Sequence, residues 1–83
     1  MARYFFDVTN FDFWPDTEGS ELPSLFDARV ESVRLSGELL RDQAEQFWQG
    51  PEWRVDVKDA AGLVLFSLTI MVTEAPAGGR LTH

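Results

Sequence analysis

The sequence predicts a two-layer α+β domain, in which a four-stranded, mainly antiparallel sheet carries one long helix on one face in the order ββαββ. Residues 3–8, 52–59 and 63–72 have the apolar content and two-residue alternation typical of strands. Residues 25–48 instead repeat apolar side chains at helical spacing, and a Gly-Pro pair follows them. A glycine-closed turn joins the last two strands into a hairpin.

Aromatic residues dominate the first strand and the connection that follows it. Phe11, Phe13 and Trp14 lie where a hairpin loop would ordinarily be short and polar. We expect them to fold back and plug the edge of the sheet, because exposed apolar patches are rare on stable monomers. An exposed adhesive patch is the alternative. Residues 16–22 are polar and acidic, and predict only a short edge strand.

The helix is expected to begin after Ser24, a suitable N-cap residue, and to end before Gly50. Its main apolar stripe is expected to pack on the sheet: Phe26, Val30, Val33, Gly37, Leu40, Ala44, Phe47 and Trp48. A second apolar set contains Leu35 and Leu39. These side chains either tuck under the rim of the sheet or meet another molecule.

The last strand, residues 63–72, is apolar at nearly every position. A strand with one face in water alternates apolar and polar residues, so this one needs cover on both faces. Alternation directs one row of side chains towards the helix: Val64, Phe66, Leu68, Ile70 and Val72. The other row is half apolar and half small polar, and the chain offers no second helix to cover it: Leu63, Leu65, Ser67, Thr69 and Met71. We expect the first and last strands at the centre of the sheet, in the order 2-1-4-3.

Length and composition indicate one acidic domain. Residues 1–72 are expected to form the domain and residues 73–83 a flexible tail. The formal net charge of −7 disfavours nucleic-acid binding, which usually requires a basic surface. The chain has no cysteine, no signal-peptide pattern and no stretch of ~20 apolar residues that could cross a membrane. We therefore expect a cytoplasmic protein.

No set of residues suited to catalysis is present, and we expect no enzyme, no cofactor and no metal site. The only histidine is His83, the terminal residue, and no serine has a base beside it. One acidic cluster does not match the spacing of a calcium-binding loop, and is expected to solvate a turn and an edge strand: Asp12, Asp16, Glu18 and Glu21. Arg29 is expected to pair with a carboxylate of this cluster.

Several segments carry a family resemblance: Arg3-Tyr4-Phe5-Phe6-Asp7, residues 16–23, Ala28-Arg29-Val30-Glu31 and residues 55–64. On these segments the chain resembles small uncharacterised proteins common in rhizobia and related alphaproteobacteria, which form a domain-of-unknown-function family. The resemblance covers most of the chain up to about Val72. It implies a single bacterial domain and no particular activity.

We expect a non-enzymatic protein-interaction module that self-associates, most simply as a two-fold homodimer. The candidate interface residues are apolar and lack obvious intrachain cover: Phe5, Phe11, Phe13, Trp14, Leu35, Leu39, Leu63, Leu65 and Met71. The open sheet face, an edge strand and the flank of the helix each remain possible. The alternative is an acidic regulator that binds and occupies a basic partner protein. A weak metal or ligand binder comes third.

Overall fold

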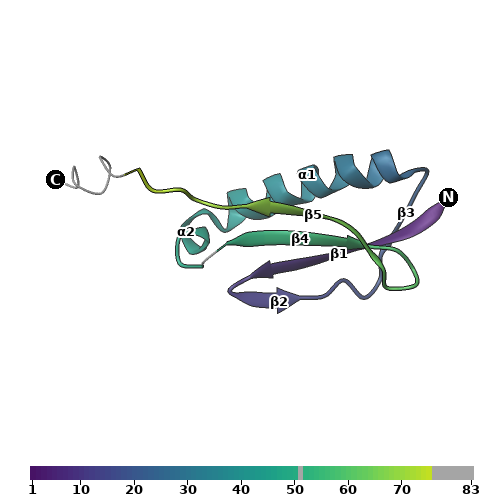
Figure 1. The fold of residues 1–83 in the computed structure, drawn as a ribbon, viewed down its shortest axis with the longest axis horizontal. Coiled ribbons are helices and arrows are strands. Elements are labelled where there is room, and N and C mark those ends of the chain that lie inside the picture. Colours follow the sequence, from purple (N-terminus) through teal and green to yellow (C-terminus); the bar gives the residue numbers. More distant parts are fainter. Residues whose placement is uncertain (51, 76–83) are drawn as a thin grey trace.

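A computed structural model of the protein describes residues 1–50 and 52–75, which form a sheet and a helical layer (Figure 1). The elements are β1 (Ala2–Asn10), β2 (Asp12–Trp14), β3 (Ser20–Leu22), α1 (Leu25–Asp42), α2 (Ala44–Phe47), β4 (Trp53–Lys58) and β5 (Val64–Ile70). The α+β class is confirmed, and the layout is close to the predicted ββαββ. The sheet has five strands rather than four, because the segment before α1 forms two short strands that pair with different parts of β1.

The sheet order is β2-β1-β4-β5, with β3 beside the first half of β1, and all pairs are antiparallel. The predicted order 2-1-4-3 is wrong, because β5 lies at the edge and β4 lies between β1 and β5. The high apolar content of residues 63–72 therefore does not indicate a central strand; it leaves apolar side chains of an edge strand incompletely buried. A register shift also places Val64 opposite Lys58, off the face that Phe66 shares with Val57.

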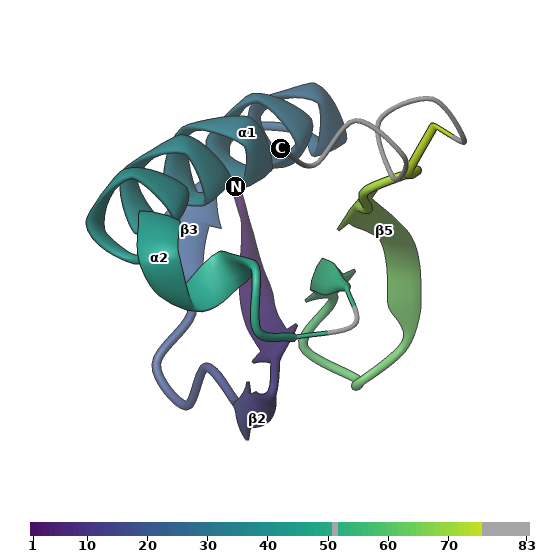
Figure 2. The same ribbon diagram turned by 90° about the vertical axis from the view of Figure 1, so that its left-hand side faces the viewer.

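The core lies between α1 and the two central strands, β1 and β4. Its buried apolar residues are Tyr4, Phe6, Val8, Ala28, Trp53, Val55 and Val57. Figure 2 shows α1 above these strands and β5 to one side of them. The tertiary contacts of α1 with the sheet are mainly with β3 and β4. The single helix therefore covers only part of the sheet.

The helix docks on the sheet through small side chains. Ala28, Ser32 and Ser36 are its buried residues. The Ser32 hydroxyl donates to the Arg29 carbonyl at 2.7 Å, and the Ser36 hydroxyl donates to the Ser32 carbonyl at 2.6 Å. These bonds satisfy both buried hydroxyls, so the helix approaches the sheet closely without an unpaired polar group.

The predicted core stripe is therefore largely wrong. Phe26 is 68% exposed, Val33 60% and Trp48 67%. Leu40 and Phe47 from that stripe do pack against the core, as do Leu35 and Leu39. The helix start is as predicted, since Ser24 accepts a hydrogen bond from the Asp27 amide, but α1 ends at Asp42 and a separate turn follows.

This orientation predicts effects of very different size for two neighbouring substitutions. Ser32→Leu is expected to lower the free energy of unfolding by about 1–3 kcal/mol, because a larger side chain overpacks this buried position. Val33→Ser is expected to change it by less than about 0.5 kcal/mol, since that side chain lies at the surface. Urea denaturation of both variants at low protein concentration tests this. A larger loss for Val33→Ser would contradict the orientation.

Candidate interaction surfaces

The two flanks of α1 carry different surfaces. Glu31 and Leu35 line a pocket together with Trp14, so this flank faces β2 and β3. At 3.6 residues per turn, Val33 and Leu40 lie on the other flank, towards β5. We call this second region the α1–β5 surface and define it by Phe26, Val33, Leu40, Phe66, Leu68 and Ile70.

The strand β5 has no neighbour on its outer edge among the described residues. Its backbone groups on that side are available for pairing with another strand. Val64 and Leu65 are exposed, and Phe66, Leu68 and Ile70 on the helix side are only partly buried. The helix stands to one side of this row (Figure 2). Both faces and the edge of β5 are therefore incompletely covered.

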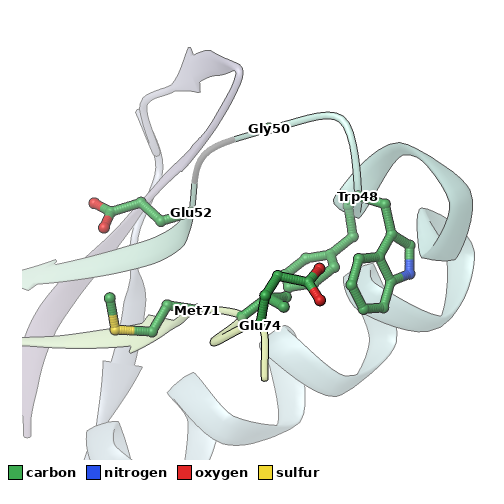
Figure 3. Close-up of a pocket in the computed structure, with 7 residues that line it drawn as sticks. Trp48, Gly50, Glu52, Met71 and Glu74 are labelled. Atoms are coloured by element: carbon green, nitrogen blue, oxygen red, sulfur yellow. The ribbon is translucent and has the colours of Figure 1, made fainter. Parts of the chain in front are cut away.

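A shallow pocket lies where α2 approaches the end of β5 (Figure 3). Its volume is about 150 Å³, and Phe47, Trp48, Met71 and Glu74 are among the residues that line it. In Figure 3 the Glu74 side chain lies towards Trp48, whereas Glu52 points away from it. Small-molecule sites commonly occupy roughly 300–1,000 Å³. This pocket therefore extends the exposed apolar surface beyond β5 and does not enclose a ligand of that size.

The open face of the sheet is polar and largely paired within itself. The Asp7 carboxylate is buried, with one oxygen 2.6 Å from Lys58 Nζ and the other accepting from the Asp16 amide at 2.9 Å. Arg54 lies 3.2 Å from Asp56 and 3.4 Å from Glu52. The central strands β1 and β4 therefore carry paired charged groups on this face.

Asp16 holds the loop before β3 against the edge of β1. Its carboxylate accepts from the amides of Phe6 at 3.1 Å, Glu18 at 3.1 Å and Gly19 at 3.0 Å. Burial raises the pKa of Asp16, but these backbone donors and the charge of Arg3 outweigh it, so the pKa lies below 3.8. The Asp16 carboxylate therefore stabilises the turn before β3 and its contact with β1.

Gly19 allows the close approach of this loop to β1. Its φ is +75°, and a Cβ there would lie 2.9 Å from the side chains of Arg3 and Phe5. Arg3 also donates to the Glu18 carbonyl and lies 3.4 Å from Glu21. The predicted pairing of Arg29 with this segment is wrong, because Arg3 takes that role. Arg29 is exposed on the flank of α1 away from β3.

The candidate interface residues fall into separate groups. Phe11, Phe13 and Trp14 are 58–70% exposed around the β1–β2 turn, so the predicted plug is wrong. The turn is tight, and Phe11 has a positive φ of 68°. Leu35 and Leu39 lie beside Trp14, because each lines a pocket with it.

The remaining candidates lie elsewhere on the sheet. Leu63, Leu65 and Met71 belong to β5 or its flanks at the opposite edge. Phe5 is partly buried and lies near Lys58 on the open face. The sequence reasoning missed Phe26 and Val33 as exposed residues. The small-residue row of Ala28, Ser32 and Ser36 was the signal that could have revealed them.

The described residues contain neither a cluster of metal-binding side chains nor a membrane-spanning helix. Within residues 1–50 and 52–75, no three His, Cys, Asp or Glu side chains gather in a way that could hold a metal ion. None of the helices there has the length and apolar character needed to cross a membrane. Most of the predicted tail, residues 73–83, lies outside the described residues.

A family model described as a domain of unknown function (DUF6894) matches residues 3–71. The chain belongs to the DUF6894 family. This confirms the resemblance to a domain-of-unknown-function family. Comparison with curated proteins and with solved structures finds no match.

Apart from Ala2, the DUF6894 match covers every strand and helix of the described residues. Both flanks of α1 therefore lie within the family domain.

Proposed function

We propose that this DUF6894 chain is a non-enzymatic protein-interaction module that self-associates as a homodimer through the α1–β5 surface. One observation carries the proposal. Phe26 and Val33 of α1 are exposed on the flank towards β5, and β5 is an apolar edge strand with no neighbour on its outer side among the described residues. Large apolar side chains at such a surface are typical of interaction sites.

A second copy of the chain suits this surface because an antiparallel strand edge is self-complementary under two-fold symmetry. The middle residue of β5 is Ser67. An axis near it would pair the two β5 strands and set Phe66 of one copy opposite Leu68 of the other. The sheets of the two copies would then be continuous, and their helix-side rows would lie side by side on the same face, between the two helices.

The energetics have two opposing parts. Burying Phe26 and Val33 would contribute roughly 1.5–3 kcal/mol per side chain if each left water completely. The net charge of −7 on each copy opposes association. Because salt screens repulsion between exposed charges, we expect self-association to tighten as the salt concentration rises.

The proposal is tested by the mass in solution of the wild type and two matched variants. The 9.4 kDa chain is expected to show twice that mass by light scattering at micromolar concentrations. The double variant Leu65→Lys/Thr69→Lys places two lysines on the exposed edge strand and is expected to be monomeric. The double variant Phe11→Lys/Phe13→Lys carries the same charge change at the opposite edge and is expected to remain dimeric.

Two outcomes would contradict the proposal. One is a monomeric wild type at every concentration and salt condition. The other is a β5 variant that dimerises as strongly as the wild type, since a contact at that edge has to respond to both lysines.

A further inference from the structure

The flank of α1 opposite the α1–β5 surface carries a groove. Three adjoining pockets, with volumes of about 340, 260 and 310 Å³, share Trp14. Phe6 and Val8 of β1 form the apolar floor of the first two pockets, and Leu35 and Leu39 form their wall on α1. We call this the β2–α1 groove. Trp14, which is 61% exposed, stands along its outer side.

The lining of the groove is acidic as well as apolar. Asp12, Asp16 and Glu31 line it, and none of its lining residues is Lys or Arg. Glu38 and Asp42 follow Glu31 at helical spacings that place them on the same flank.

Arginines on α1 offset part of this charge. Arg34 lies 3.9 Å from Glu31, and Arg41 lies 3.7 Å from Asp42. Both pairs are exposed and loose, so they neutralise the rim only weakly. The groove is complementary to a ligand that is both apolar and positively charged.

Asn10 provides a second observation at the far end of the groove. This residue lines the third pocket, is only 7% exposed, and its Oδ1 has no hydrogen-bond partner within the described chain. The neighbouring Trp53 has a buried Nε1 that likewise lacks one there. Buried polar groups without partners cost stability. The Asn10 carboxamide is therefore a polar group that the described residues leave unsatisfied at this end of the groove.

We propose that the β2–α1 groove binds a cationic amphipathic helix from another protein. Its apolar side chains would pack on Trp14, Leu35 and Leu39, and its basic residues would face the acidic rim. The part of this wall that α1 forms, from Glu31 to Asp42, is about 16 Å long at 1.5 Å per residue, so a bound helix of about 14 residues would span it with one turn to spare. This is the groove mode of helix recognition.

The test uses a synthetic peptide of about 14 residues with leucine and lysine at helical spacing. Its affinity for the full chain is measured by calorimetry, with a peptide in which glutamate replaces lysine as the charge control. The lysine peptide is expected to bind, and more weakly as salt rises; the glutamate peptide is not. Trp14→Ala is expected to weaken binding by about tenfold or more, as loss of a central aromatic anchor does.

Three further variants keep the test specific. Glu31→Lys is expected to weaken binding of the lysine peptide through charge alone. It therefore provides an independent test should Trp14→Ala disturb the local fold. Trp48→Ala removes the other exposed tryptophan and is expected to leave the affinity unchanged. The β5 double-lysine variant is also expected to bind, which separates this proposal from self-association.

Three results would overturn the assignment of the groove. These are no binding of the lysine peptide, equal binding of the glutamate peptide, and unchanged affinity in both Trp14→Ala and Glu31→Lys.

Discussion

Replacing Asp16 with alanine is expected to lower the free energy of unfolding by about 2–4 kcal/mol. The Asp16 carboxylate accepts hydrogen bonds from the amides of Phe6, Glu18 and Gly19. Alanine would leave all three amides without this acceptor. Bonds to a charged acceptor contribute more than neutral ones, although they do not add fully. Urea denaturation measures the loss. Asp12→Ala, at an exposed acidic position nearby, is the control and is expected to have little effect.

The same carboxylate makes part of the stability dependent on pH. Because the pKa of Asp16 is lower in the folded chain than the ordinary 3.8, its ionised form stabilises the fold. This contribution is complete well above 3.8 and is lost as the pH falls through the lowered pKa. The gap in stability between the wild type and Asp16→Asn is therefore expected to narrow in acid below pH 3.8. A gap that stays constant, or that widens in acid, would contradict this role.

Lys58→Met is expected to have an effect of similar size, about 2–4 kcal/mol. The Asp7 side chain is 4% exposed, and Lys58 Nζ lies 2.6 Å from its carboxylate. The register also sets Asp56 directly opposite Asp7, so two carboxylates share this part of the open face. Without the lysine, the Asp7 charge stays buried beside a like charge. Because the Lys58 side chain is partly exposed, the expected loss of stability is smaller than for an ion pair with both partners fully buried.

The matched control for Lys58 is a pair at the surface. Arg41 lies 3.7 Å from Asp42, and both side chains are mostly exposed. Arg41→Met is expected to change the free energy of unfolding by less than about 0.5 kcal/mol. Chemical denaturation compares the two variants directly. Equal effects of Lys58→Met and Arg41→Met would show that burial of Asp7 does not govern the pair.

Local signals in the sequence predicted much of the fold. Ser24 begins the helix, residues 53–58 alternate between buried and partly buried side chains, and Gly62 adopts the positive φ that a hairpin turn favours. These features depend on neighbouring residues only. The class and most element boundaries therefore follow from the sequence without tertiary information.

The orientation of α1 could not be predicted in the same way. The most apolar stripe contains Phe26 and Val33, and periodicity alone places such a stripe on the core. The structure instead uses Ala28, Ser32 and Ser36, because small side chains allow the helix to approach β3 and β4 closely. That preference depends on the distance between two layers, and the sequence carries it only as the row of small residues at helical spacing.

The position of β5 and the β2–α1 groove were hidden for a related reason. A central strand and an edge strand that pairs with another molecule can both be apolar throughout, so composition does not distinguish them. Trp14, Leu35 and Leu39 were each identified as interface candidates from the sequence. Their proximity depends on β2 pairing with β1 beneath α1, across more than twenty residues of sequence.

The central claim is that a second copy covers β5 and the exposed stripe of α1. Amide hydrogen exchange, measured from nanomolar to high micromolar protein concentration, tests it most directly. We predict that the amides of β5 become more protected as the concentration rises, while those of β2 at the opposite edge do not change. Exchange of β5 that is the same at every concentration would contradict the claim.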